Sequence, residues 1–286
     1  MVSYREKLEE AIQRTIEKGF EQTRAEWLFL DIFNWSRTDY LIHKHDEVTQ
    51  TDISKFNLAL KRMLSGEPIQ YIVGFQSFYG YQFKVNNHCL IPRLETEEVM
   101  LHFLNLCSDR QTVADIGTGS GVIAITLKLL KPDLNVYATD LYRDALEVAE
   151  ENAQYHLQDI HFLEGNALKP LIKKQIKIDG LISNPPYIDK SESVFMDDTV
   201  LKYEPHQALF ADDKGYAIYI DILKNLPLIM NDGGFIVFEI GYQQGEKLKS
   251  IIHHLYPNKQ VEVIKDINGN QRICLLYTSD AADEED

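Results

Sequence analysis

The feature that most constrains the fold is an alternation of short apolar runs and helix-like segments after residue 111. The apolar runs predict β-strands at Thr112–Ile116, Asn135–Asp140, 160–165, Ile178–Ser183 and 234–240. Apolar residues at helical spacing predict helices at 122–131, 144–152, 216–230 and 245–254, and a last pair of strands is expected at 260–266 and 272–277. Such alternation is typical of an α/β domain whose sheet is mostly parallel.

The residues before this domain follow two other patterns. In residues 1–67, apolar side chains recur at helical spacing over 8–16, 25–32 and 53–64, which predicts a small helical domain. Residues 68–93 carry β-type residues, at 71–73 and 81–85, around Gly74 and Gly80, and predict a β-hairpin connector. The α/β domain then covers residues 94–277.

The last nine residues differ from both. Residues 278–286 hold five acidic residues and no basic one, a composition that predicts a disordered tail. The run from Leu276 to Glu284 also resembles translated adapter sequence, foreign to the natural gene, and we assign it no function.

Composition excludes several classes of protein. A formal net charge of −15 argues against a protein that holds nucleic acid on a broad basic face. No apolar run is long enough to cross a bilayer, and the N-terminus lacks the apolar segment of a signal peptide. We therefore expect a cytoplasmic protein that contacts neither nucleic acid nor membrane.

The cysteines and histidines do not indicate a metal site. Cys89, Cys107 and Cys274 lie far apart and are odd in number, so neither a disulfide framework nor a zinc site is expected. Buried, reduced thiols are the simpler interpretation. The nine histidines show no ligand spacing with one another.

A glycine-rich loop joins the first predicted strand of the α/β domain to its helix. In parallel sheets, the loop at the carboxyl end of a strand is where nucleotides bind. A dinucleotide fingerprint needs a glycine at position 122, where this chain has Val122, whereas D-x-G-x-G-x-G is typical of class I methyltransferases. The residues expected to contact a cofactor here are Gly117, Thr118, Gly119, Ser120 and Gly121.

Asp140 ends the second predicted strand of the α/β domain. At that position a carboxylate can accept hydrogen bonds from both ribose hydroxyls of an adenosine. The alternative interpretation is an ordinary glycine-rich turn, with Asp140 as an acid that merely flanks a helix. The glycine loop and Asp140 both follow predicted strands, however, and their occurrence together favours a cofactor site.

The fourth predicted strand runs directly into Asn184, Pro185, Pro186 and Tyr187. Proline has no N–H, so the carbonyl of Pro185 can remain free, and the Asn184 side chain adds a second acceptor. Two acceptors can hold both hydrogens of an –NH2 group and stabilise the charge that develops during transfer. Tyr187 offers a ring face for a planar group. The motif therefore predicts methylation of an amide- or amine-type nitrogen, although an ordinary proline turn is the structural alternative.

Over nearly its whole length to about residue 277, the sequence resembles the bacterial peptide chain release factor glutamine methyltransferases of the HemK/PrmC type. The resemblance rests on segments at 67–74, 90–97, 115–121, 184–188, 203–205 and 238–241. It implies a class I methyltransferase fold, which is Rossmann-like, with an α/β sheet, a small N-terminal helical domain and a β-hairpin connector. Asn-Pro-Pro-Tyr alone is shared with nucleic-acid amino-methyltransferases, but Leu90-Ile-Pro-Arg93 and Tyr203-Glu-Pro205 are more specific.

The resemblance also implies a reaction. S-adenosyl-L-methionine would donate a methyl group to the side-chain nitrogen (N5) of the glutamine in the Gly-Gly-Gln motif of class 1 release factors. The glycine loop, Asp140, Asn166 and Asn184 would contact the cofactor, Asn184 to Tyr187 would hold the glutamine, and the N-terminal helices would help to recognise the release factor. We expect a monomer.

Two positions depart from the family pattern. Leu94 stands where a second proline is usual, and Asn166-Ala167 replaces an acid followed by an aromatic residue. Asn166 can still bond an adenine amino group, but the missing ring removes a stacking surface, so these changes bear on cofactor affinity. Glu204 and Glu239 are open at this stage: each either lines the pocket or is a solvated or helix-capping acid.

Two other functions compete with this one. A nucleic-acid methyltransferase acting on adenine N6 or guanine N2 would hold a similar planar –NH2 group from a flipped base. The acidic balance and the lack of a basic recognition domain argue against it. A non-catalytic adaptor is the third possibility, and the intact Asn-Pro-Pro-Tyr motif argues against lost activity.

Overall fold

A computed structural model describes residues 2–280. The chain divides into two compact units. The helical unit comprises residues up to Phe75 together with Asp197–Tyr203, and the sheet unit comprises Gln76–Met196 and the residues from Glu204 onward. Within the described residues, no helix combines the length and the apolar character needed to span a bilayer.

The helical unit is built around an aromatic core. Its helices are α1 (Tyr4–Glu17), α2 (Gln22–Phe33), α3 (Arg37–His43), α4 (Gln50–Leu64), α5 (Ile69–Val73) and α10 (Asp198–Tyr203). Ser3 begins α1 with a capping box to Glu6, which satisfies backbone donors at the helix start. Phe29 and Phe56 are fully buried with their ring centroids 5.1 Å apart. The three predicted helices are confirmed, and α3 and α10 were not predicted.

The expected strand character of residues 71–73 is wrong, because they belong to α5. The carbonyl of Pro68 accepts hydrogen bonds from the backbone N–H groups of Tyr71 and Ile72, and Gly74 ends the turn at a φ of 83°. The β-type side chains suggested a strand, but the proline start and glycine stop specify one helical turn. A hairpin is present within residues 68–93, but its strands are β1 (Phe75–Phe78) and β2 (Tyr81–Lys84), so only the second predicted strand agrees.

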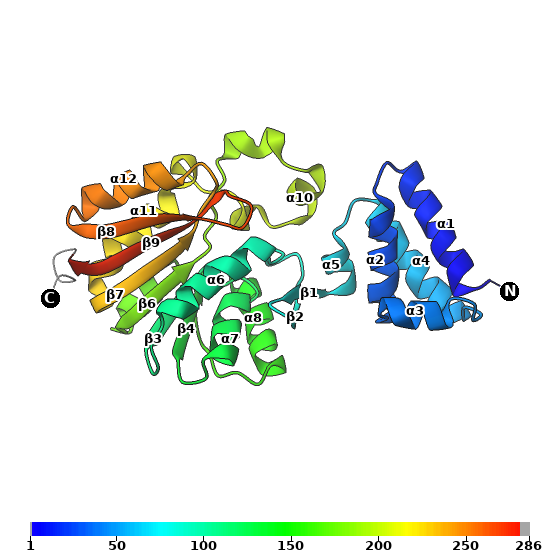
Figure 1. Cartoon of the computed structure of the whole chain (residues 1–286), viewed down its shortest axis with the longest axis horizontal. Coiled ribbons are helices and arrows are strands. Elements are labelled where there is room, and N and C mark those ends of the chain that lie inside the picture. The colour runs from blue at the N-terminus through cyan, green and yellow to red at the C-terminus, as the bar shows by residue number, and fades with distance from the viewer. Residues whose placement is uncertain (1, 281–286) are drawn as a thin grey trace. The chain divides into compact units, whose positions relative to one another are not determined.

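The sheet unit contains seven strands in the order β5-β4-β3-β6-β7-β9-β8. The part of this order from β4 to β8 can be followed in Figure 1. The strands are β3 (Thr112–Ile116), β4 (Asn135–Asp140), β5 (His161–Glu164), β6 (Ile178–Ser183), β7 (Met230–Glu239), β8 (Lys259–Lys265) and β9 (Gln271–Asp280). The first five are parallel, and β9 is antiparallel to both β7 and β8. The predicted α/β class with a mostly parallel sheet is confirmed.

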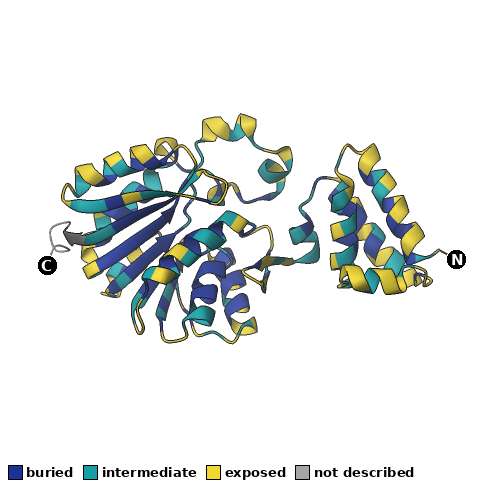
Figure 2. Ribbon diagram, viewed as in Figure 1, coloured by how far each residue is buried: buried dark blue, intermediate teal, exposed yellow. Residues whose placement is uncertain are grey.

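Helices cover both faces of this sheet and bury two hydrophobic clusters. The helices of the unit are α6 (Leu94–Leu106), α7 (Val122–Leu130), α8 (Arg143–Tyr155), α9 (Lys169–Lys173), α11 (Ala217–Asn225) and α12 (Gly245–Leu255), with short 3-10 turns at Lys190–Phe195, His206–Ala208, Asp213–Gly215 and Leu226–Leu228. One cluster includes residues of α6 and α7, the other residues of α11 and α12. In Figure 2 the central strands are accordingly buried.

The strand order places a switch point between β3 and β6. The chain runs from β3 outward through β4 to β5, and then returns to β6 on the other side of β3. In open α/β sheets, ligands bind beyond the carboxyl ends of the strands at such a point. The residues after β3, β4 and β6 therefore meet at one edge of the sheet.

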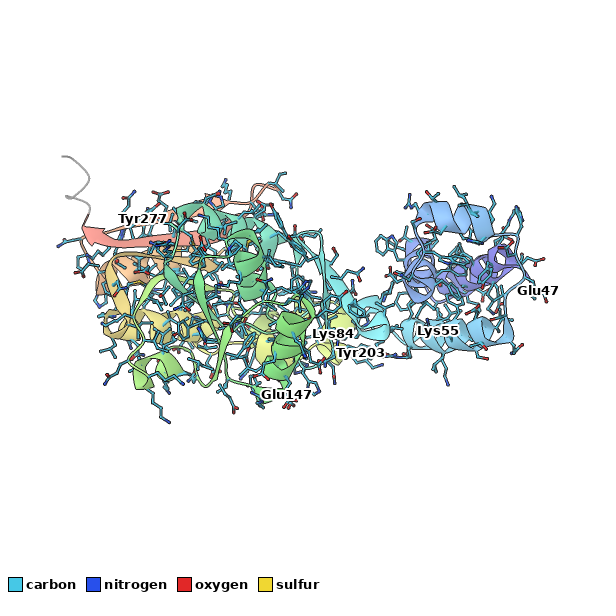
Figure 3. The ribbon with its side chains drawn as sticks, turned by 90° about the horizontal axis from the view of Figure 1, so that it is seen from below. Glu47, Lys55, Lys84, Glu147, Tyr203 and Tyr277 are labelled. Atoms are coloured by element: carbon cyan, nitrogen blue, oxygen red, sulfur yellow. The ribbon has the colours of Figure 1, made fainter. Side chains whose placement is uncertain are left out.

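The C-terminal strand is longer than expected. β9 continues through Asp280, beyond Tyr277 (Figure 3), so the first residues of the segment that we expected to be disordered are a strand. Thr278 donates its hydroxyl proton to the carbonyl of Gly234 over 2.7 Å, so β7 holds it in place. Residues 281–286 lie outside the described residues. The three cysteines are buried and free, as predicted.

Candidate active site

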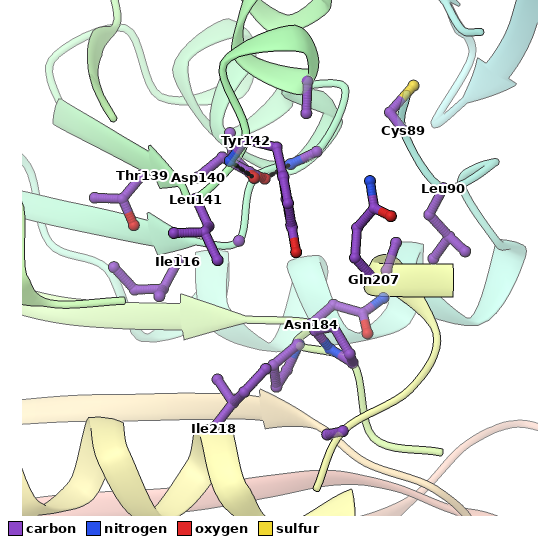
Figure 4. Close-up of a pocket in the computed structure, with 18 of the residues that line it drawn as sticks. Cys89, Leu90, Ile116, Thr139, Asp140, Leu141, Tyr142, Asn184, Gln207 and Ile218 are labelled. Atoms are coloured by element: carbon purple, nitrogen blue, oxygen red, sulfur yellow. Dashed lines mark hydrogen bonds between the residues drawn. The ribbon is translucent and has the colours of Figure 1, made fainter. Parts of the chain in front are cut away.

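A cavity of about 350 Å³ lies at the carboxyl edge of the sheet (Figure 4). Its walls come from the glycine loop, the ends of β4 and β6, the start of α6 and the segment 207–218. Most of the residues predicted to form the site line it: Gly117, Thr118, Gly119, Ser120, Asp140, Asn166, Asn184, Pro185 and Pro186. Gly121 and Tyr187 are missing from the described residues that line this cavity.

The glycine loop follows β3 and opens α7. Gly117 and Gly119 have positive φ angles, and a Cβ built on either would meet no atom within 4 Å. These two glycines are therefore required by the backbone turn, and they leave the loop open. Gly121 has a different role, since an added Cβ would lie 3.0 Å from the Cβ of Ala149 in α8. It permits close packing of the loop on α8.

Asp140 at the end of β4 faces this loop. Its two carboxylate oxygens accept hydrogen bonds from the backbone N–H of Gly119 over 2.9 Å and from that of Tyr142 over 3.0 Å. Only 9% of the residue is exposed, and burial raises the pKa of its carboxyl group, although the backbone donors oppose the rise. Each oxygen retains acceptor capacity for a further donor in the cavity.

Asn184 follows β6 and is oriented by a side chain that sequence reasoning did not identify. Its Nδ2 donates to the Oγ1 of Thr96 over 3.2 Å, and Thr96 donates to the Oε2 of Glu239 over 2.7 Å. With its nitrogen held by Thr96, the Asn184 amide retains its oxygen as an acceptor, which bonds no other group among the described residues. Pro185 is buried beside it, and within the described residues its carbonyl accepts no backbone hydrogen bond.

Tyr187 packs behind the cavity wall instead of forming it. Its ring lies against the hydrophobic cluster that contains Tyr219, and its carbonyl accepts a hydrogen bond from Gln244 over 2.8 Å. Burial raises the pKa of Tyr187 to about 12, with a further contribution from the charge of Glu239. Tyr142, which sequence reasoning missed, extends its ring into the cavity instead (Figure 4).

A partly buried ion pair joins Arg93, which lines the cavity, to Glu204. The Nη2 of Arg93 donates to the Oε1 of Glu204 over 2.7 Å, and the backbone N–H of Ile91 donates to its Oε2 over 3.3 Å. The side chain of Glu204 is 2% exposed, so the solvated alternative for this acid is excluded. The pair ties the segment before α6 to the segment that begins at Glu204. Leu94, one of the two departures, is 71% exposed.

The buried carboxylate of Asp115 holds the glycine loop through hydrogen bonds. Its Oδ2 accepts from the hydroxyl of Thr118 over 2.6 Å and from the backbone N–H of Ala124 over 3.2 Å, while its Oδ1 has no partner among the described residues. Burial raises the pKa of Asp115 to about 7, opposed by the two hydrogen bonds. The folded chain therefore holds a proton here that the unfolded chain loses near its ordinary pKa of about 3.9.

This difference makes stability depend on pH. Because the folded state binds the extra proton, the contribution of Asp115 to stability is fully present below about pH 4 and is lost as pH rises through 7. Asp115→Asn removes that titration, so its free energy of unfolding relative to wild type should rise by about 1.4 kcal/mol per pH unit between pH 5 and 7. Urea unfolding of both proteins at pH 5, 6, 7 and 8 measures this, and a constant difference would contradict it.

Two family models match parts of the chain. Residues 6–74 match the model of the PrmC N-terminal domain, and residues 95–203 match that of the methyltransferase small domain. A solved structure of a methyltransferase from Pyrococcus furiosus is similar in fold, with a TM-score of 0.52 at 19% identity, over 76% of this chain and 95% of that one.

Two curated relatives cover almost the whole chain. The release factor glutamine methyltransferase of Staphylococcus aureus is 62% identical over 96% of this chain and 98% of its own length. That of Enterococcus faecalis is 41% identical over 90% of this chain and 93% of its own. The alignments span both units, including the cavity and the helical unit. The chain therefore belongs to the release factor glutamine methyltransferase family.

Proposed function

We propose that this chain transfers a methyl group from S-adenosylmethionine to the side-chain amide nitrogen of the glutamine in the Gly-Gly-Gln motif of class 1 release factors. The observation that carries the proposal is the position of Asn184. Its amide borders the same cavity as the glycine loop and Asp140, and its nitrogen is already engaged by Thr96. An acceptor is thus held ready for a substrate N–H beside a site suited to a nucleoside.

The residues of the cavity fit this cofactor. Gly117 and Gly119 leave space that any Cβ would restrict, which suits the amino-acid part of S-adenosylmethionine. The carboxylate of Asp140 can accept hydrogen bonds from the ribose hydroxyls, and the side chain of Asn166 can bond the adenine amino group. The apolar side chains of Ile116 and Leu141 line the same cavity and can pack against the nucleoside. When bound, S-adenosylmethionine supplies an electrophilic methyl group on a positively charged sulfur.

The chain's own groups would then orient the nucleophile. The Oδ1 of Asn184 and the carbonyl of Pro185 would each accept one N–H of the glutamine amide. Holding both bonds favours rotation or pyramidalisation that frees the delocalised lone pair, and it stabilises positive charge on the nitrogen as it forms. Correct placement of the nitrogen supplies much of the remaining acceleration. No strong base is needed beforehand, because the nitrogen becomes far more acidic once it is methylated.

We propose that the helical unit recognises the release factor. Trp27 of α2 is 54% exposed, and exposed tryptophans are frequent anchors in protein interfaces. Trp27→Ala should raise the KM for an intact release factor roughly 5- to 30-fold, the size of effect expected when one strong interface contact is lost. The KM for a short Gly-Gly-Gln peptide should stay unchanged. Steady-state kinetics on both substrates measure this. An equal rise for the two would mean that Trp27 acts through the fold.

We also expect the enzyme to act as a monomer in the cytoplasm, where its proposed substrate is found. Light scattering coupled to gel filtration tests the first expectation.

The proposed function is tested by offering radiolabelled S-adenosylmethionine with a class 1 release factor, duplex DNA or ribosomal RNA in separate reactions. We expect label in the release factor, and none when its Gly-Gly-Gln glutamine is replaced by alanine. Label in DNA or RNA instead would favour the nucleic-acid alternative, and no transfer to any substrate would favour a non-catalytic adaptor.

A further inference from the structure

Three side chains from different elements form a hydrogen-bonded chain that begins at the cavity wall, which Asn184 and Thr96 line, and ends at the buried Glu239. Glu239 lies at the end of β7, Thr96 in the first turn of α6 and Asn184 just beyond β6. The Oγ1 of Thr96 is 2.7 Å from the Oε2 of Glu239 and 3.2 Å from the Nδ2 of Asn184. Thr96 is 3% exposed and Glu239 is 2% exposed, so water does not compete for these bonds.

The chain matters because an amide has two ends of nearly equal shape. If the oxygen of Asn184 faces the cavity, it accepts a substrate N–H, whereas its NH2 group would oppose that N–H with another donor. Something must therefore fix which end is presented. Thr96 contacts this amide directly, but its hydroxyl can act as donor or acceptor, so Thr96 alone does not decide.

Glu239 decides the direction of the chain. As a carboxylate it can only accept, so it takes the single hydroxyl proton of Thr96. The oxygen of Thr96 must then accept, and the only end of Asn184 that can donate to it is Nδ2. If Glu239 is protonated, it can donate to Thr96, whose own proton then turns toward Asn184 and favours the opposite amide orientation.

We propose that Glu239, acting through Thr96, is a positioning residue that holds the Asn184 amide with its oxygen toward the substrate nitrogen. The inference rests on the proposed transfer to an –NH2 group. It assigns a role to two buried residues: Thr96, which lines the cavity and contacts Asn184, and Glu239, which is absent from the described residues that line the cavity and acts through Thr96.

The surroundings of Glu239 make this chain sensitive to pH. Burial raises the pKa of Glu239 to about 7; the Thr96 hydrogen bond and the charges of Arg272 and Arg93 oppose the rise, and the charge of Glu95 adds to it. The other titratable groups facing this region are Tyr187 beyond β6, Tyr219 of α11 and Cys274 of β9, all with raised pKa values and neutral near pH 7. Of these, Glu239 is the group whose charge changes near neutrality.

The test compares single-turnover transfer rates from pH 5.5 to 9 at saturating cofactor. The variants are Glu239→Gln, which keeps the shape but loses the titrating group, Thr96→Val, which removes the hydroxyl, and Thr96→Ser, which keeps it. Wild type and Thr96→Ser should lose rate as pH falls through about 7. Glu239→Gln and Thr96→Val should be roughly 10- to 100-fold slower at pH 8, as expected for a misplaced catalytic group, and should lack that acid limb.

Two controls separate positioning from folding. Melting temperature and cofactor affinity should match wild type in the compared variants, and rescue by Thr96→Ser excludes a purely steric effect at that position. If Glu239→Gln or Thr96→Val transfers methyl at the wild-type rate with the wild-type pH profile, the proposal is overturned. If wild type methylates a nucleic-acid amino group instead of the release factor, the proposed function fails, but the same profiles on that substrate still test Glu239.

Discussion

Asn184→Ala should transfer methyl groups about 10²–10³-fold more slowly than wild type while it keeps its fold and most of its cofactor affinity. The variant loses the acceptor that we propose for one substrate N–H, and removing one preorganised hydrogen-bonding group from an active site has an effect of this size. Single-turnover transfer to a release factor measures the loss, and calorimetry measures cofactor binding.

Asn231→Ala is the matched control. Asn231 also bonds a side chain through its amide, with its Nδ2 2.7 Å from the Oδ1 of Asp179, but it lies near the start of β7, away from the cavity. This variant should keep the wild-type rate. A wild-type rate in Asn184→Ala would mean that the Asn-Pro-Pro-Tyr segment is only a turn, and the mechanism would have to be abandoned.

Asp140→Ala should weaken S-adenosylmethionine binding by about 10- to 150-fold, which corresponds to the roughly 1.5–3 kcal/mol of hydrogen bonds to a charged group. In the folded chain this carboxylate also holds the backbone N–H of Gly119, so the loop loses a restraint as well. Asp140→Asn keeps the shape without the charge and should be intermediate. Isothermal titration calorimetry of the three proteins measures the effect.

Asp133→Ala provides the comparison for this variant. Asp133 is exposed and precedes β4, whereas Asp140 ends the same strand. Removing its charge should leave cofactor affinity unchanged, which separates a local effect from a general effect of net charge. If Asp140→Ala binds S-adenosylmethionine as wild type does, Asp140 is not part of the cofactor site.

Strands with a continuous apolar run could be predicted from the sequence, whereas short elements with mixed signals could not. The bounds of β3, β4 and β6 agree with the prediction, because both faces of these strands are buried and nearly every residue must be apolar or small. Helix α6 was missed although Val99, Met100 and Phe103 carry helical spacing and are buried. Its first turn carries Glu95 and Glu97, and acidic residues there favour a helix start, so the signal was present in the sequence.

The residues of the active site likewise fall into those that could be predicted from the sequence and those that could not. The glycine loop and Asp140 could be found because each motif is continuous or ends a strand. The contacts among Thr96, Asn184 and Glu239 could not, because they join residues far apart in the chain that only the sheet order brings together. Tyr187 illustrates the opposite error, since a motif member was assigned to the cavity by proximity in sequence although its side chain packs behind the wall.

We propose that the acceptor pair beyond β6, the Asn184 side chain and the Pro185 carbonyl, directs methylation to one glutamine nitrogen. Tandem mass spectrometry of a release factor after incubation with this chain and S-adenosylmethionine tests it most directly. We predict one added methyl group on the side-chain amide of the Gly-Gly-Gln glutamine, and almost none with Asn184→Ala after the time in which wild type completes one turnover. A methyl group on any other residue, or an unmodified release factor beside a methylated nucleic acid, would contradict it.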